Sequence, residues 1–283
     1  MARPNRIKLS GEGFYHVIDR IAHREFLLED ERVKKTLLDL MRRAAEFSGV
    51  DVCTYVFMDN HLHICVHVPE TSEVDEQTVL CRVGTLYGES RANALKDELD
   101  RLRTEGRDDE AARMLDRLRA RMGDLSEFMK TFKQRVTQWY NRELGHGGTL
   151  WCGRFKSVLL ESDDAVRVVA NYIHCNPVRA KMVDSAADYR WSGLGAAIRG
   201  NARAIRGLSV IGMSISGQGM DVPARDLRLV NGLIVGGIGF VREMAARLNA
   251  KFRGMPTLRR VGASGKGCLY ASHGGRSAPK RVA

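Results

Sequence analysis

The alternation in residues 61–68 constrains the fold of this chain more than any other pattern. Every second residue there is apolar, namely Leu62, Ile64, Val66 and Val68. Because successive side chains of a strand point to opposite faces, this alternation predicts a half-buried strand with His61 and His63 together on its other face. Another strand-like run, residues 50–58, ends two residues before His61, which is hairpin spacing. We therefore expect two strands that pair antiparallel.

The spacing of His61 and His63 suits a metal site. Neutral imidazole is the commonest metal ligand among side chains, and a pair leaves positions open for a third ligand, water and a substrate oxygen. Alternating histidines are also typical of the polar face of a half-buried strand, and the pair alone does not decide between these interpretations. Cys65 and His67 share this face, but four such residues span about 20 Å, too far for one ion. The candidate ligands are His61 and His63.

Charge is distributed unevenly along the 283 residues, whose formal net charge is +11. Residues 1–176 contain 27 Lys and Arg against 29 Asp and Glu, a net charge of −2. Residues 177–283 contain 18 against 5, a net charge of +13. This asymmetry indicates a polyanionic partner held by the C-terminal region, with a solvated basic tail as the alternative.

The six cysteines are scattered and include no Cys-x-x-Cys pair, so neither a zinc ribbon nor a disulfide framework is predicted. A reduced, cytoplasmic setting follows. No N-terminal apolar run suits a signal peptide, and residues 233–240 are too short and glycine-rich to span a bilayer. We expect a protein that is neither exported nor bound to a membrane.

The remaining periodicities alternate helices with strands but show no regular βαβ rhythm. They predict strands over residues 13–19 and 151–160, and helices over about 29–47, 72–121 (with a turn near Gly106), 125–142 and 163–175. The charge-rich stretch 72–121 is interpreted as a helical hairpin insertion. Interspersed helices and antiparallel strands favour an α+β fold over a doubly wound sheet.

In the predicted helix 163–175 and just beyond it, Tyr172 and Asn176 are four residues apart and share a face. A phenol can attack phosphorus and form a covalent ester when a metal offsets the phosphate charge. Asn176 offers a neutral oxygen to such a metal. Taken alone, a tyrosine at this position is more often a core residue with its hydroxyl at the rim, and an asparagine before Pro177 is more often a helix C-terminal residue.

Three motifs together resemble the REP-associated tyrosine transposases, single-tyrosine members of the HUH (His-hydrophobe-His) endonucleases. They are, in order, Met58–His63 (MDNHLH), Trp151–Ser157 (WCGRFKS) and Asn171–Ala180 (NYIHCNPVRA). The similarity covers about residues 10–195, and three ordered motifs are far more specific than one. Two positions depart from the family pattern: Asp59 stands where many relatives have Pro, and Cys175 where an aliphatic residue is expected.

The resemblance implies a ferredoxin-like antiparallel sheet with packed helices. The helical insertion and the basic C-terminal extension come from the sequence patterns above, and the extension lies beyond the three motifs. The resemblance also implies that His61, His63 and Asn176 hold Mg²⁺ or Mn²⁺ and that Tyr172 is the nucleophile. The implied activity is nicking and joining of single-stranded DNA near hairpins through a 5′-phosphotyrosine, by a monomer or homodimer in a prokaryotic cytoplasm, nucleoid-associated when DNA-bound. Alternatives are a rolling-circle initiator or relaxase, a domesticated non-cleaving DNA-binding protein, and a structural zinc protein.

Basic residues near the motifs are candidates for DNA contacts. Arg154 and Lys156 are expected to alternate on one face of the strand 151–160 and to reach phosphates, with exposed strand charges as the alternative. Lys133, Arg135 and Arg142 lie on the helix 125–142 and either follow the phosphate backbone or form a solvated face.

We expect three parts in the chain. The HUH single-tyrosine transposase domain takes residues 1–195, with the insertion at about 72–121. A small, basic, mainly helical accessory region takes 196–261, and 262–283 form a disordered tail.

Overall fold

The computed structural model describes residues 9, 11–70, 73–161, 164–215 and 233–247, and the backbone of 257–264 and 267–273. These residues form an α+β fold around a seven-stranded sheet in the order β2-β3-β1-β4-β5-β7-β6. Among the described residues, no helix combines the length and apolar composition that a bilayer-spanning segment requires.

Four strands make the antiparallel core of the sheet: β1 (Gly13–Arg20), β2 (Asp51–Phe57), β3 (His61–Val68) and β4 (Lys156–Leu160). The order β2-β3-β1-β4, with α1 joining β1 to β2, is ferredoxin-like, and every pair in it is antiparallel. The expected hairpin of β2 and β3 is confirmed. In this register His63 pairs with Ile18 of β1 and Val56 of β2, so all three share one face of the sheet.

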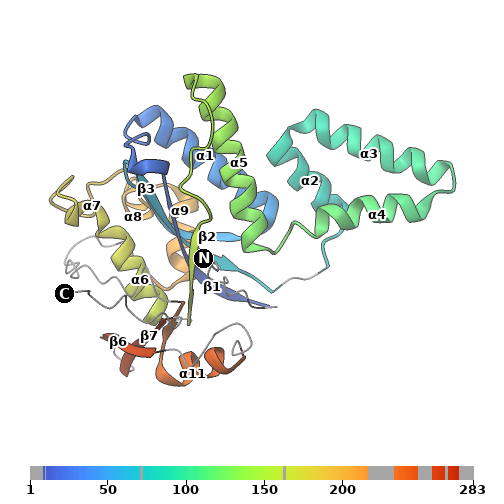
Figure 1. The fold of residues 1–283 in the computed structure, drawn as a ribbon. Coiled ribbons are helices and arrows are strands. Elements are labelled where there is room, and N and C mark those ends of the chain that lie inside the picture. Colours follow the sequence, from blue (N-terminus) through green and yellow to red (C-terminus); the bar gives the residue numbers. More distant parts are fainter. Residues whose placement is uncertain are drawn as a thin grey trace, which may run out of the picture.

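Helices cover both faces of this core (Figure 1). On one side, α1 (Glu31–Ser48) packs against α5 (Leu125–Leu144); on the other, α6 (Asp164–His174) packs against β2 and β3. The ends of α1 follow from its sequence. Asp30 caps the first turn by accepting from the Arg32 amide, and Gly49 ends the helix with a φ of 62°, a conformation that favours glycine.

The insertion forms an arm of three helices that projects from the sheet (Figure 1): α2 (Glu76–Tyr87), α3 (Glu89–Thr104) and α4 (Asp108–Arg119). We expected a two-helix hairpin, and Gly88, with a φ of 96°, divides its first half into two helices. The predicted turn at Gly106 is confirmed, with a φ of 71°. The arm has a small core of its own, into which Phe47 of α1 packs.

The C-terminal region differs from expectation because it continues the sheet. β5 (Ile234–Gly236) pairs parallel with β4, and β7 (Gly267–His273) and β6 (Thr257–Ser264) extend the sheet beyond it. Residues 262–264 and 267–273 of the expected disordered tail are thus part of strands. Residues 265–266 and 274–283 lie outside the described residues. The other elements after α6 are the short helices α7 (Asn176–Arg179), α8 (Gly193–Ile198), α9 (Ala202–Val210) and α11 (Ile238–Arg247).

Several residues of the expected accessory region join the main hydrophobic core. They are Ala204, Leu208, Ile211, Ile234, Val235, Val241 and Met244. Among the described residues, this region thus has no core separate from that of the catalytic candidate residues. β5 has only three residues, and all three strands contain glycine, which weakens the strand signal in the sequence.

The close packing of α9 on β2 supplies a stability prediction. A Cβ at Gly207 would lie 2.5 Å from the Val52 carbonyl oxygen and 2.6 Å from that of Cys53, both backbone atoms. We expect Gly207→Ala to lower the free energy of unfolding by about 1–3 kcal/mol, although alanine favours helix by about 1 kcal/mol. Urea unfolding followed by circular dichroism measures this change.

Gly239→Ala is the matched control for this prediction. Gly239 is also helical, and nothing lies within 4 Å of its added Cβ. This control should be neutral or stabilising by about 0.4–1 kcal/mol. Equal effects of the two substitutions would show that the contact between α9 and β2 does not require glycine.

Candidate functional site: a histidine pair facing a helix-borne tyrosine

The two histidines of β3 lie side by side, as predicted from the alternation. The ring centroids of His61 and His63 are 5.2 Å apart. His63 is buried and His61 is half-buried, on the face of the sheet that α6 covers. The alternating strand therefore gathers two imidazoles at the boundary between the sheet and α6.

A hydrogen bond holds one ring nitrogen of each histidine. His61 Nδ1 lies 2.7 Å from Asn60 Oδ1, and His63 Nδ1 lies 2.8 Å from His16 Nε2 on β1. Such bonds fix the orientation of a ring and the nitrogen that carries its proton. In both rings the nitrogen outside these bonds is Nε2, so the two Nε2 atoms are the ones suited to bind a cation.

The turn before His61 is anchored by an ion pair at the position where the family pattern has Pro. Asp59 Oδ1 accepts from Lys34 Nζ of α1 at 2.6 Å, and the Lys34 side chain is only 5% exposed. The Asp59 carbonyl accepts from the Leu28 amide at 2.9 Å. The aspartate thus replaces the rigidity of proline with contacts that tie the turn to α1.

Tyr172 of α6 faces the histidines. Its ring centroid is 6.0 Å from that of His63 and 6.2 Å from that of His16, and only 3% of the residue is exposed. Arg179 lies over the ring at 4.1 Å and donates to the Tyr172 carbonyl at 2.6 Å. Tyr172 and His63 are more than 100 residues apart in the sequence, and the packing of α6 on the sheet brings them together.

A buried contact fixes α6 against β2. Thr54 Oγ1 lies 2.6 Å from His174 Nε2, and both side chains are buried. Burial lowers the pKa of His174 to about 3, so this imidazole is neutral at physiological pH. The bond therefore joins two neutral groups and sets the rotation of the helix that carries Tyr172.

Asn176 begins α7, one turn beyond Tyr172. Its Nδ2 donates to the carbonyls of Tyr172 at 3.0 Å and Ile173 at 3.2 Å, and the residue is 9% exposed. These bonds satisfy two carbonyls at the end of α6 and engage the nitrogen end of the amide. The amide oxygen is the ligand atom that the resemblance requires, and it takes no part in these bonds.

Electrostatics keep His63 in the form that binds metal. Burial lowers its pKa well below the usual value, and the neighbouring His16, His61, Arg179 and Arg20 act in the same direction. A neutral imidazole is the ligating form, and Arg20 and Arg179 supply positive charge for an anionic substrate.

Two imidazoles with oriented rings are donors that suit a divalent ion, and they lie side by side on β3. The Asn176 amide oxygen is the third ligand that the resemblance implies, and Asn176 lies at the start of α7. Among the described residues, no group of three His, Cys, Asp or Glu side chains is placed to hold a metal.

The predicted DNA-contacting residues do not all gather at this site. Lys156 pairs with Ile18 across β1 and β4, so it lies on the face that carries His63, and it is exposed. Arg154 is exposed but precedes β4, which begins only at Lys156, so the expected alternation of the two on one strand is wrong. The glycine at 153, with a φ of 138°, interrupts the strand.

The three basic residues of α5 point elsewhere. Lys133 forms an ion pair with Asp19 at 2.7 Å on the opposite face of β1, and its side chain is 14% exposed. Arg135 donates to the Leu86 carbonyl at 2.6 Å, at the base of the arm. Arg142 is exposed and pairs with Glu143. Their assignment to DNA stays a prediction.

Sequence reasoning missed His16, Arg20 and Arg179. His16 lies on the strand predicted for residues 13–19, and β1 continues one residue further to Arg20; pairing with β3 was needed to place the two residues beside His63 and His61. Arg179 lies inside the third motif, and its stacking on Tyr172 appears only when α6 and α7 are folded together. The signal available in the sequence was the same-face spacing of His16 and Arg20 on their strand.

His67, the last histidine of β3, belongs to a different cluster. Its Nδ1 lies 3.0 Å from Asp51 Oδ2 and its Nε2 lies 2.7 Å from Glu12 Oε1. The hydrogen bond to Asp51, and then that to Glu12, raises its pKa against the effect of burial. Carboxylates engage both ring nitrogens, so we do not include His67 among the residues that could bind a cation together with His61 and His63.

This cluster predicts a dependence of stability on pH. Because the pKa of His67 is raised on folding, its contribution is fully present below about pH 6.5 and is lost as the pH rises through the folded-state pKa. The carboxylates are 60% and 55% exposed, so we expect less than about 1 kcal/mol. Urea unfolding of wild type and His67→Gln should differ more at pH 6 than at pH 9. An equal difference in unfolding free energy at pH 6 and pH 9 would contradict a stabilising contribution of these ion pairs.

Comparison with known proteins agrees with this site. Residues 12–80 match the family described as "Transposase IS200 like". This segment contains β1, α1, β2, β3 and the start of α2, and therefore both histidines. Residues 12–80 are thus similar to the IS200-like transposases, in agreement with the resemblance seen in the first motif; Tyr172 and Asn176 lie outside the matched segment.

Two further comparisons were made. No curated protein matches the chain. A solved structure described as "Structure of the REP associates tyrosine transposase bound to a REP hairpin" is 16% identical, with a TM-score of 0.49; the similarity covers 80% of this chain and 96% of that one.

Proposed function

We propose that the chain is a transposase-like, metal-dependent endonuclease and strand transferase that acts on single-stranded DNA near hairpins. The observation that carries this proposal is the placement of Tyr172 opposite His63 and His16, with ring centroids 6.0 and 6.2 Å apart. A nucleophile on a helix and a cation site on a sheet are the two parts that phosphoryl transfer to a tyrosine requires.

In the proposed reaction, the Tyr172 hydroxyl oxygen attacks the scissile phosphorus in line. A bond forms between this oxygen and phosphorus, and the bond from phosphorus to the 3′-oxygen breaks. The products are a 5′-phosphotyrosine and a free 3′-hydroxyl, with the phenol proton lost and one proton gained by the leaving oxygen. Since one phosphoester replaces another, a second 3′-hydroxyl can reverse the step and join new ends without a nucleotide cofactor.

The residues of the site divide this work. Arg179 lies over the Tyr172 ring, where its charge favours the phenolate that develops during attack. Arg20 and the exposed Lys156 lie on the same face and are placed to hold substrate phosphates. His61, His63 and Asn176 would hold Mg²⁺ or Mn²⁺, which supplies positive charge at the phosphate oxygens. His16 and Asn60 keep the two imidazoles oriented.

A covalent adduct tests the proposal directly. The purified chain is incubated with single-stranded oligonucleotides from the DNA that flanks its own gene, including hairpins, with Mn²⁺ and with EDTA in parallel. We expect a protein–DNA band that survives denaturing electrophoresis and depends on Mn²⁺. Tight binding of the oligonucleotides with no adduct would instead identify a non-cleaving DNA-binding protein.

A further inference from the structure

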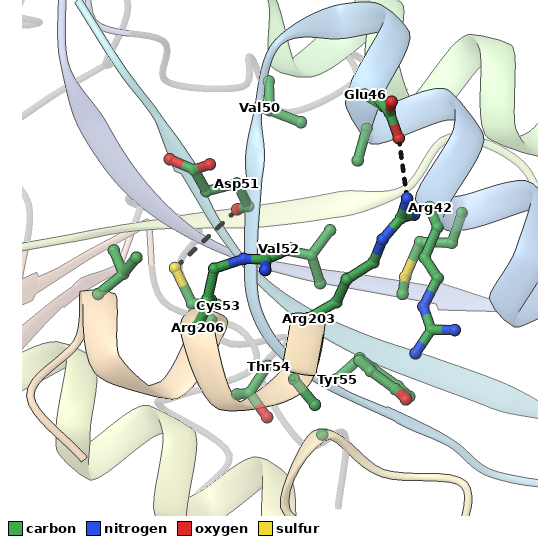
Figure 2. A pocket seen from close by; sticks show the side chains of 16 residues that line it. Arg42, Glu46, Val50, Asp51, Val52, Cys53, Thr54, Tyr55, Arg203 and Arg206 are labelled. Atoms are coloured by element: carbon green, nitrogen blue, oxygen red, sulfur yellow. Dashed lines mark hydrogen bonds and ion pairs between the residues drawn. The ribbon is translucent and has the colours of Figure 1, made fainter. Parts of the chain in front are cut away.

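A cavity of about 450 Å³, lined by apolar side chains and by charged groups, lies at the free edge of the sheet, outside the site described above. It spans β2, the terminal strand, between α1 on one face and α9 on the other (Figure 2). The neighbouring strand β3 covers only the inner side of β2. A volume of this size is within the range of small-ligand sites.

Three arginines line this cavity: Arg42 of α1, and Arg203 and Arg206 of α9. Arg203 pairs with Glu46 at 3.3 Å, as Figure 2 shows. Arg42 donates to the neutral Asn201 at 3.1 Å, and Arg206 makes no ion pair or hydrogen bond with any described residue. Two guanidinium charges are thus left without a carboxylate in the described structure.

The carboxylates of the cavity are already engaged. Asp51 accepts from His67 in the cluster described above, and Glu46 accepts from Thr85 as well as from Arg203. Among the described residues, neither carboxylate forms an ion pair with Arg42 or Arg206, and three arginines face two carboxylates. The surplus of positive charge favours an anionic ligand.

The rest of the lining suits an aromatic ring with polar edges. Apolar side chains form much of the wall, namely Met41, Ala45, Val50, Val52, Ala204 and Val210. Tyr55 is 3% exposed, and among the described residues its hydroxyl forms no hydrogen bond of good geometry, although the Arg42 guanidinium faces it. A buried hydroxyl of this kind favours a ligand whose polar edge completes its hydrogen bonding.

We propose that this cavity binds one unpaired nucleotide of the DNA strand, with its phosphate between Arg42 and Arg206 and its base against the apolar wall near Tyr55. This inference rests on the proposed function, because that function supplies single-stranded DNA as the ligand. Thr54 connects the two sites: it lines the cavity and is bonded to His174 on the helix of Tyr172. The pocket would thus hold a nucleotide away from the scissile phosphate and help to set where the strand is cut.

Binding measured without metal tests the charged half of this proposal. Fluorescence anisotropy with a labelled single-stranded oligonucleotide in EDTA is compared between wild type and the double variant Arg42→Gln, Arg206→Gln. We expect about tenfold weaker binding, and a slope of log K against log salt that is smaller by roughly 0.7 for each lost phosphate contact. Lys96→Gln with Arg113→Gln, two exposed positions on the arm, is the control of equal charge. An equal loss of affinity in both double variants would overturn the proposal that the cavity binds the DNA strand.

A steric variant tests occupancy without a change of charge. Val210 is 46% exposed at the cavity wall, so Val210→Trp fills the space without disturbing the core. We expect about tenfold weaker binding with an unchanged salt slope, and near wild-type binding by Val210→Ala. Wild-type affinity of Val210→Trp, with unchanged circular dichroism and urea unfolding, would overturn the proposal.

Two further measurements distinguish a DNA strand from a free nucleotide as the ligand, and distinguish failure of this inference from failure of the proposed function. Competition by free deoxynucleoside monophosphates at micromolar concentration would assign the cavity to free nucleotides and overturn the assignment to a DNA strand. The covalent adduct of wild type is recorded separately. Pocket-dependent binding without any adduct would contradict the proposed function alone, whereas an adduct with pocket-independent binding would contradict this inference alone.

Discussion

Replacing Tyr172 by phenylalanine is expected to abolish the covalent adduct and to lower DNA cleavage by at least about 10³-fold. The substitution removes only the hydroxyl oxygen that attacks phosphorus, and it keeps the ring that packs against His16, His63 and Arg179. Binding of single-stranded DNA in EDTA should therefore stay near the wild-type value. Denaturing electrophoresis of oligonucleotide reactions with Mn²⁺ gives the adduct, and anisotropy gives the binding.

Tyr140→Phe is the matched control for this experiment. Tyr140 is also a buried tyrosine on a helix, but it lies on α5, where its ring contacts Trp139 and His146 instead of the histidine pair. This variant should cleave at the wild-type rate. Adduct formation by Tyr172→Phe together with its loss in Tyr140→Phe would transfer the role of nucleophile to Tyr140.

The parts of the site that the sequence predicted are those set by local periodicity. His61 and His63 are two residues apart on one strand, so their common face follows from the strand repeat alone. Tyr172 and Asn176 are related by one turn of helix, and the structure places them at the end of α6 and the start of α7. In both cases the relevant distance is short along the chain, and no tertiary information is needed.

The parts that escaped prediction depend on pairing between distant segments. His16 becomes the partner of His63 only because β1 and β3 are neighbours in the sheet, 47 residues apart in sequence. The ion pair of Lys133 with the buried Asp19 of β1, at 2.7 Å, likewise depends on the packing of α5 on the sheet, and the assignment of Lys133 to DNA stays a prediction. A helical wheel of α5 gives the face on which Lys133 lies, but it does not show which strand packs against that face.

The C-terminal region shows a different limit. Its excess of arginine and glycine predicted an appendage, yet Ile234 and Val235 form a buried parallel strand beside β4. A three-residue strand is too short to produce an alternation that sequence analysis can detect. Part of the positive charge of this region lies on a helix that packs on the core, because Arg203 and Arg206 of α9 line the cavity at the edge of β2.

Substitution of either histidine of the pair is expected to remove metal-dependent cleavage, because one imidazole and one amide oxygen hold a divalent ion poorly. We expect His61→Ala to lower both Mn²⁺ affinity, measured by calorimetry without DNA, and Mn²⁺-dependent cleavage by about 10²-fold or more. His63→Ala should do the same and should also destabilise the fold by about 1–3 kcal/mol, since it leaves the buried His16 without its partner at 2.8 Å. His61 is half-buried whereas His63 is buried, so the loss of His61 should cost less stability.

The difference between these two variants makes the metal assignment testable even though one of them perturbs folding. His67→Ala is the control, since His67 lies on the same strand and face but is bound to Asp51 and Glu12. It should keep Mn²⁺ affinity and cleavage. Cleavage that persists in His61→Ala and His63→Ala, or that resists EDTA in wild type, would remove the metal from the mechanism and leave Arg20 and Arg179 as the charges that stabilise the phosphate.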